Sequence, residues 1–168
     1  MKNIFDRLIV SIIGLTALGI SSLAAQAMNM DNGRPAHVTE YFPYGHPGSS
    51  GGPVQVIHIK ALDIRFEPKR ITVHRGETVK FVVSNDGKLT HEFVIGDAAL
   101  QAAHEKEMQT MSGMEMHDVN GVTLLPGQTR DLVWTFTRDG VVEYACHEPG
   151  HFAAGMFGEI VITSTRHH

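Results

Sequence analysis

Hydrophobic and polar residues alternate in short runs from Val54 to the end of the chain. Such alternation puts every second side chain on one face of a β-strand. The expected buried faces carry Ile57, Ile59 and Ala61; Ile71 and Val73; Val79, Phe81 and Val83; Leu132, Trp134 and Phe136; Val142, Tyr144 and Cys146; Ile160 and Ile162. Turn dipeptides such as Arg75-Gly76 and Pro126-Gly127 separate these runs. We therefore predict an all-β domain, a sandwich of two antiparallel sheets.

One segment, residues 98–118, departs from the alternation. It begins with good helix formers between Ala98 and Met108 and continues into a stretch rich in methionine. We expect an excursion with a short helix, which leaves the sandwich after the strand that carries His91 and returns near Val122.

The first 27 residues have the pattern of a secretory signal peptide. Lys2 and Arg7 give a positive start, Leu8 to Leu23 is an apolar run diluted by Ser and Gly, and Ala25-Gln26-Ala27 fits a small-x-small cleavage site. We expect cleavage after Ala27 and a periplasmic protein without stable membrane insertion. An uncleaved N-terminal anchor is the alternative.

Composition divides the remaining chain into two parts. Residues 28–53 are polar and rich in Gly, Pro and Ser, which predicts a flexible lead-in. Residues 54–168 contain all the predicted strands and form the expected domain. The net charge is −4 and no basic patch stands out, so nucleic acid is not an expected partner.

The single cysteine opens the run Cys146-His147-Glu148-Pro149-Gly150-His151-Phe152-Ala153-Ala154-Gly155-Met156. An unpaired thiol in an exported protein needs an occupant, and a metal ion provides one by binding the thiolate. With His91 from upstream, the run supplies the two imidazoles, thiolate and weak axial thioether that are typical of a blue-copper site. A buried, inert cysteine is the alternative.

The chain resembles the cupredoxins, and most of all the periplasmic copper-tolerance cupredoxins of the CopI type. The resemblance rests on the segments Gly76 to Asn85, His91 to Gly96, Pro126-Gly127 and Cys146 to Met156, and it extends over residues 54–163. It implies a Greek-key β-sandwich with one type 1 copper ion. The ligands that it implies are His91, Cys146, His151 and Met156.

Two residues next to the expected ligands deserve separate predictions. Azurin- and plastocyanin-like proteins have Asn directly after the first histidine ligand, where this chain has Glu92. Because groups around the ligands tune a copper site, a green, more tetragonal centre is a hypothesis beside a blue one. His147 follows Cys146 and points to the opposite side of an extended segment. We expect it to be an exposed loop residue and not a copper ligand.

Soft donors also gather in the excursion, which suggests an auxiliary copper site. A helix would place His104 and Met108 on one face, and thioethers are good donors for Cu(I). The methionines lack the Leu and Ile neighbours of a packed face, although packing onto the sandwich is the alternative. The candidate auxiliary residues are His104, Met108, Met111, Met114, Met116 and His117.

Three functions remain for comparison. A copper oxidase is disfavoured, because its trinuclear cluster needs several His-x-His pairs and the chain has none. We therefore expect no enzymatic activity. A one-electron carrier needs only the four ligands, so the additional Met and His residues favour copper binding in copper tolerance. Copper ions are the expected partners, with a redox or copper-transfer protein as a further candidate.

Replacing Met108, Met111, Met114 and Met116 by Leu is predicted to lower the number of copper ions bound per chain. Leucine keeps the apolar volume but removes the sulfur donor. Mass spectrometry of the intact copper-loaded protein measures the stoichiometry. Equal copper content in the variant and the wild type would rule out an auxiliary site.

Overall fold

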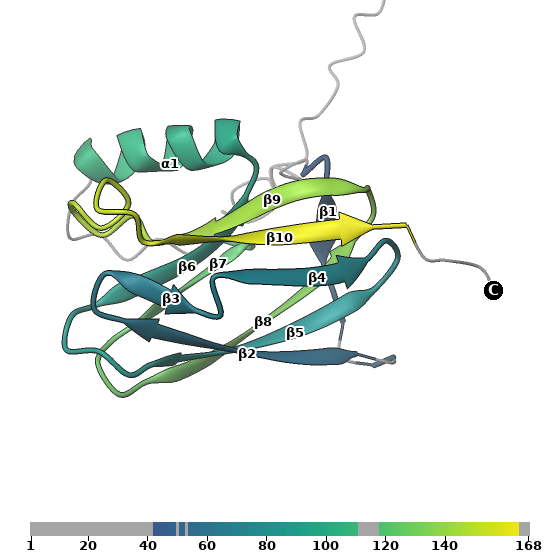
Figure 1. Cartoon of the computed structure of the whole chain (residues 1–168), viewed down its shortest axis with the longest axis horizontal. Coiled ribbons are helices and arrows are strands. Elements are labelled where there is room, and N and C mark those ends of the chain that lie inside the picture. Colours follow the sequence, from purple (N-terminus) through teal and green to yellow (C-terminus); the bar gives the residue numbers. More distant parts are fainter. Residues whose placement is uncertain (1–41, 50, 53, 111–117, 165–168) are drawn as a thin grey trace, which may run out of the picture. The chain divides into compact units, whose positions relative to one another are not determined.

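Two five-stranded β-sheets pack face to face in the computed structural model, which describes residues 42–49, 51–52, 54–110 and 118–164 (Figure 1). The first sheet has the strand order β1 (Gly45–Pro47), β8 (Thr129–Phe136), β5 (Thr78–Asn85), β2 (Gln55–Leu62) and β3 (Arg65–Glu67). The second has the order β4 (Arg70–His74), β10 (Phe157–Thr163), β9 (Gly140–Ala145), β6 (His91–Gly96) and β7 (Gly121–Leu124). These elements belong to one compact unit, Thr39–His168.

The predicted sandwich is confirmed, but its sheets are mixed and not purely antiparallel. β2 pairs in parallel with β5, and β4 pairs in parallel with β10. The chain passes from β2 and β3 in the first sheet to β4 in the second, and then returns to the first sheet as β5. Parallel neighbours need such a crossover. Alternation along a strand shows which face is buried and carries no information about the direction of the neighbouring strand.

The core between the sheets consists of the alternating residues that the sequence predicts. Phe81 in β5 and Trp134 in β8 are fully buried, and so is Phe93 in β6. The ring centroids of Phe81 and Phe93 lie 5.4 Å apart across the sandwich, and Phe66 meets Phe93 edge-on at 5.9 Å. Large aromatic rings dominate the energetics of such a core.

The fold begins earlier than the predicted boundary at Val54. Phe42 and Tyr44 are each 4% exposed, and both pack against Trp134 with ring centroids 5.1 and 5.9 Å away. The Tyr44 hydroxyl donates a hydrogen bond to the carbonyl of Ile95 at 2.8 Å. β1 then pairs with β8. Both aromatic residues fall in the predicted lead-in because residues 28–53 are mostly polar. The predicted lead-in is therefore too long, since Phe42 and Tyr44 belong to the core.

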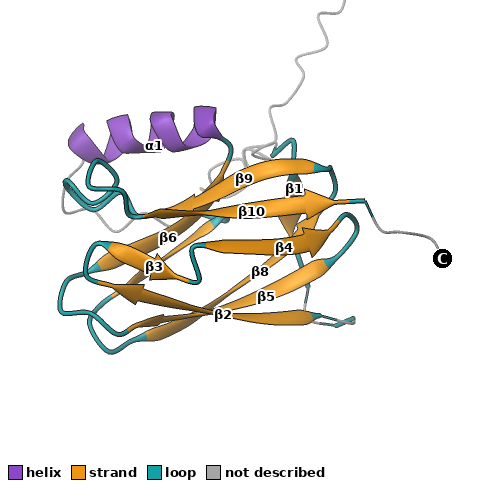
Figure 2. Ribbon diagram, in the orientation of Figure 1, coloured by secondary structure: helices purple, strands orange, loops and turns teal. Residues whose placement is uncertain are grey.

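The expected short helix is α1 (Ala98–Thr110), and it lies against the outer side of β6 and β9 (Figure 2). Asp97 caps its first turn, because its carboxylate accepts the Leu100 N–H at 2.9 Å. The buried side chains of the helix are Gln101, His104 and Met108. Since α1 covers this face, every residue of β6 is buried. None of the helices in the described part of the chain has the length and apolarity to cross a membrane.

Replacing Phe42 by Ala is predicted to lower the free energy of unfolding by about 3 kcal/mol, because it leaves a cavity against the core. Chemical denaturation measures the effect. Val56→Ala is the control, since Val56 is 52% exposed and its change should stay within about 0.5 kcal/mol. A Phe42→Ala effect as small as that of the control would show that residues before Val54 are not part of the core.

Candidate metal centre

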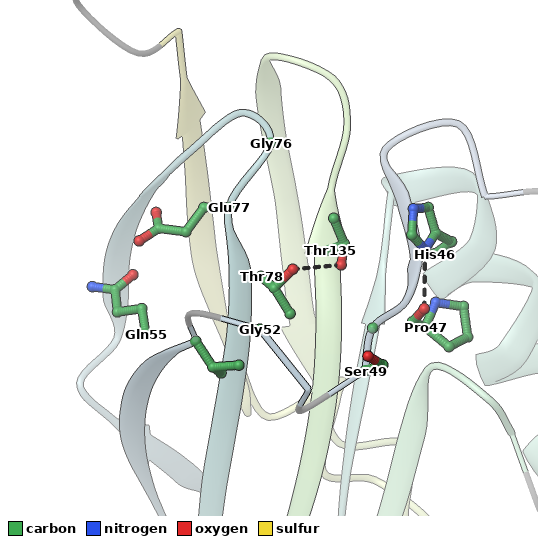
Figure 3. Close-up of a pocket in the computed structure, with 11 residues that line it drawn as sticks. His46, Pro47, Ser49, Gly52, Gln55, Gly76, Glu77, Thr78 and Thr135 are labelled. Atoms are coloured by element: carbon green, nitrogen blue, oxygen red, sulfur yellow. Dashed lines mark hydrogen bonds between the residues drawn. The ribbon is translucent and has the colours of Figure 1, made fainter.

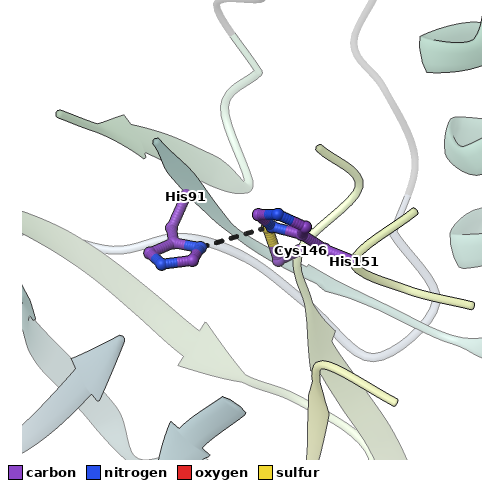
Figure 4. A group of neighbouring side chains, drawn as sticks. All are labelled: His91, Cys146 and His151. Carbon is purple, nitrogen blue, oxygen red and sulfur yellow. Dashed lines mark hydrogen bonds between the residues drawn. The ribbon is translucent and has the colours of Figure 1, made fainter. Parts of the chain in front are cut away.

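The centre is built where β6 begins and β9 ends. His91 is the first residue of β6, and Cys146 directly follows the last residue of β9. His151 and Met156 lie in the loop that joins β9 to β10. β6 and β9 pair with Val94 opposite Ala145, and this register brings the upstream histidine to the cysteine (Figure 4).

Three of the four predicted ligands form a compact cluster. The Sγ atom of Cys146 lies 3.3 Å from Nδ1 of His151 and 3.9 Å from Nδ1 of His91. One ligand atom from each residue lies within 4.8 Å of the others. His91 and Cys146 are fully buried, and His151 is 9% exposed. Two imidazoles therefore point their Nδ1 atoms at one sulfur.

Met156, the fourth predicted ligand, is fixed beside this cluster by its backbone. Its N–H donates to the carbonyl of His151 at 3.0 Å, and its carbonyl accepts the N–H of Cys146 at 3.1 Å. Its side chain is fully buried. Axial ligation by its thioether stays a prediction.

Local conformation lets the loop fold back in this way. Gly150 and Gly155 adopt φ angles of 85° and 91°, which side chains with a Cβ rarely adopt. The N–H of Gly155 donates to the carbonyl of Phe152 at 2.9 Å. The two glycines therefore allow the turns that return the chain from Cys146 to Met156.

The environment sets the protonation of the donors. Burial lowers the pKa of His91, and the neighbouring His151 lowers it further, whereas Asp63 raises it. Burial also lowers the pKa of His151. Burial raises the pKa of the Cys146 thiol to about 12. At neutral pH the metal-free centre thus has two neutral imidazoles and a protonated thiol, and a metal ion has to displace the thiol proton.

This donor set fits copper. A thiolate with two imidazoles is the combination that favours copper in a trigonal arrangement. The backbone N–H of Glu92 donates to Sγ of Cys146 at 3.3 Å. That bond partly stabilises the thiolate and also ties β6 to the residue that follows β9. The donors of the site therefore come from strand β6 and from the segment that follows strand β9.

His147 is buried, and the prediction of an exposed loop residue is wrong. It is 1% exposed, because α1 covers it. Its Nδ1 lies 2.8 Å from Oε2 of Glu105 and its Nε2 lies 2.7 Å from Oε1 of Gln101. Both partners are acceptors, so the imidazolium form satisfies both contacts. Burial lowers the pKa of His147 and opposes that charge, and the Glu105 carboxylate raises it.

The structure places only part of the predicted auxiliary site. His104 and Met108 are buried on the inner side of α1. Nε2 of His104 lies 3.6 Å from a carboxylate oxygen of Glu92, and Nδ1 lies 3.6 Å from one of Asp118. The Glu92 contact raises the pKa of His104, although burial opposes it. The other candidates, Met111, Met114, Met116 and His117, lie outside the described residues.

Asp63 is a contact of the centre that the sequence analysis did not identify. Its Oδ1 lies 3.4 Å from Nε2 of His91, on the side of the ring away from Cys146. Hydrogen bonds from the N–H groups of Lys88 and Leu89 lower the pKa of this carboxyl. The Asp63 carboxylate therefore contacts the His91 imidazole at the ring nitrogen that faces away from Cys146. Only the position of Asp63 before a short strand could have suggested this.

A cleft of about 910 Å³ lies elsewhere, between β1, β5 and β8 (Figure 3). Thr78, at the start of β5, and Thr135 share a hydrogen bond of 2.8 Å in its wall. The metal centre lies beyond the opposite end of β5, near Gly87. The described lining residues include one histidine, His46, and no cysteine, so this cleft lacks the thiol and the pair of imidazoles that the metal centre contains.

Comparisons with known proteins agree with this centre. The family described as copper binding proteins, plastocyanin/azurin family, matches residues 54–163. The copper-resistant cuproprotein CopI of Rubrivivax gelatinosus is 44% identical over 121 residues, which are 71% of this chain and 73% of that protein. The one of Pseudomonas aeruginosa is 36% identical over 157 residues, covering 76% and 85% of the two chains. The chain belongs to the plastocyanin/azurin family of copper-binding proteins, and within it to the cupredoxins of the CopI type.

Solved structures support the fold. Dithionite-reduced auracyanin from the photosynthetic bacterium Roseiflexus castenholzii has a TM-score of 0.59 at 23% identity, over 66% of this chain and 98% of that chain. Auracyanin B has a TM-score of 0.60 at 20% identity, over 71% and 96%. Both are similar to this chain in the arrangement of the sandwich.

Copper affinity is predicted to rise about tenfold for each pH unit between about pH 7 and 9. In this range the imidazoles are already neutral, whereas the thiol, whose pKa is about 12, must lose one proton on binding. Competition titrations with a chelator, corrected for the protonation of the chelator, measure the slope. Cys146→Ser should bind copper without this slope. A wild-type affinity independent of pH would show that no thiolate binds the metal.

Proposed function

We propose that this chain is a periplasmic copper-binding protein with one type 1 copper centre, and that it acts in copper tolerance by binding Cu(I) and Cu(II). The observation that carries the proposal is the buried cluster of His91, Cys146 and His151. Met156 is the proposed axial ligand. A bound copper ion would supply one-electron redox chemistry, and the chain supplies the ligands and their dry surroundings.

The assignment to copper tolerance is supported by the relatives. The CopI proteins of R. gelatinosus and P. aeruginosa are described as copper-resistant cuproproteins, and the present chain covers most of each. The auxiliary residues of the excursion are proposed to add copper capacity. The periplasmic location is supported by the signal-peptide pattern of residues 1–27. We propose no enzymatic activity.

One-electron transfer to a redox partner is the alternative function. The observation that favours it is the compact buried cluster, in which the ligand atoms of His91, Cys146 and His151 lie within 4.8 Å of one another. Donors that suit both oxidation states with little rearrangement allow fast electron exchange. The same site is therefore compatible with copper tolerance and with electron transfer. Growth experiments with and without added copper distinguish the two functions.

A deletion strain is predicted to lose growth only when copper is added. The wild-type gene should restore growth, and genes with Cys146→Ser or His151→Ala should not, because each removes a donor from the buried cluster. His58→Ala is the matched control, since His58 is an exposed histidine in β2 outside the centre and its variant should restore growth.

Two outcomes would contradict this proposal. A respiratory defect without added copper would favour the electron carrier. Full restoration by Cys146→Ser would show that the thiolate centre is not needed for tolerance. Absorption and EPR spectra of the copper-loaded protein test the type 1 assignment, and the ratio of the two thiolate-to-copper absorption bands separates a green from a blue centre.

A further inference from the structure

The imidazole of His91 has two different neighbours. Its Nδ1 faces Sγ of Cys146 at 3.9 Å, and its Nε2 faces Oδ1 of Asp63 at 3.4 Å. The Nε2 atom is fully buried and has no hydrogen-bond partner within the usual limits among the described residues. A buried ring N–H needs an acceptor, and the Asp63 carboxylate is the acceptor within reach.

Asp63 is itself held in a defined position. Its Oδ1 accepts the N–H of Lys88 at 2.8 Å and the N–H of Leu89 at 3.2 Å. These residues belong to the loop between β5 and β6 that leads into His91. One carboxylate oxygen therefore joins the β2–β3 turn, the incoming loop and the ring of the expected ligand.

Gly87 leaves room for this arrangement. A Cβ at residue 87 would overlap Oδ1 of Asp63 and would stand 3.1 Å from Nε2 of His91. Its φ angle lies outside the left-handed region, so the backbone alone does not require glycine there. The close approach of the carboxylate to the imidazole is what excludes a larger residue.

The turn that presents Asp63 has an unusual backbone. Ile64, the next residue, has a φ angle of 66°, which is a genuine outlier for a β-branched side chain. Such conformations persist where surrounding contacts fix them, and they concentrate at functional sites. The strained turn keeps Asp63 directed toward the loop and the histidine.

We propose that Asp63 is a positioning residue for the copper centre, which orients His91 through Nε2 and stabilises Cu(II) relative to Cu(I) with its negative charge. Carboxylates that accept the second N–H of a metal-bound histidine fix its tautomer and raise its basicity. The N–H on Nε2 leaves the Nδ1 lone pair for the metal. This inference rests on the proposed copper centre.

The main test compares Asp63→Asn with Asp86→Asn in the copper-loaded protein. Asparagine retains an oxygen for the Lys88 and Leu89 N–H groups but removes the charge beside His91. Asp86 is the matched control, because its exposed side chain belongs to the β5–β6 loop, which also contains Lys88 and Leu89, and pairs with Lys60 at 3.6 Å. Asp63 and Asp86 side chains are 41% and 42% exposed.

The measured quantity is the reduction potential, with EPR spectra recorded in parallel. Asp63→Asn should weaken the binding of Cu(II) about tenfold relative to the binding of Cu(I). This change corresponds to a rise in the reduction potential of about 59 mV for one electron. Asp86→Asn should change the ratio of Cu(II) to Cu(I) affinity less than about twofold, since the Asp86 carboxylate pairs with the Lys60 ammonium, whereas the Asp63 carboxylate faces the ring of His91. Equal potentials for Asp63→Asn and Asp86→Asn would overturn the proposal.

Gly87→Ala provides a second variant that keeps the charge and displaces it. Its added methyl group should push Asp63 away from His91 and raise the potential in the same direction. Circular dichroism of the metal-free variants reports their folding, and if Asp63→Asn does not fold, an unchanged potential in Gly87→Ala overturns the proposal. A wild-type protein without a thiolate-to-copper absorption band would instead overturn the copper centre, and with it the role of Asp63.

Discussion

The structure depends on one buried sulfur atom that lies between two segments distant in the sequence. Cys146 directly follows strand β9 of the second sheet, and the N–H of Glu92 on the adjacent strand β6 donates to its Sγ. The ring nitrogens of His91 and His151 approach the same atom. A protonated thiol in this position is stabilised by burial, and only a strongly bound cation recovers the cost of removing its proton. The register of β6 with β9 is thus both a packing requirement and a chemical one.

Helix α1 makes this end of the sheet a closed layer. It buries the outer side of β6, and its polar residues contact the residues that follow two of the four expected ligands. His104 approaches Glu92, which follows His91, and Glu105 approaches His147, which follows Cys146. The His147–Glu105 contact is a hydrogen bond of 2.8 Å, whereas His104 and Glu92 lie 3.6 Å apart, close enough for electrostatic attraction. Helix α1 is therefore attached to the surroundings of the metal centre through side chains.

Much of this organisation could be predicted from the sequence. Alternation gives the buried faces of the strands, and the spacing from Cys146 to His151 gives two of the clustered donors. Pairing direction, the burial of His147 and the contact of Asp63 with His91 could not be predicted, because each depends on how distant segments meet. Phe42 and Tyr44 were missed for another reason: a few aromatic residues in a polar segment are enough to anchor it to Trp134.

The small exposed fraction of His151 determines where a metal ion or a protein partner can reach the centre. The other expected ligands have no accessible surface, whereas 9% of this residue reaches solvent. An incoming ion, or a protein that exchanges an electron, would meet the imidazole edge before any other donor atom. Selection among partners would therefore depend on the shape and polarity of the surface around a single ring.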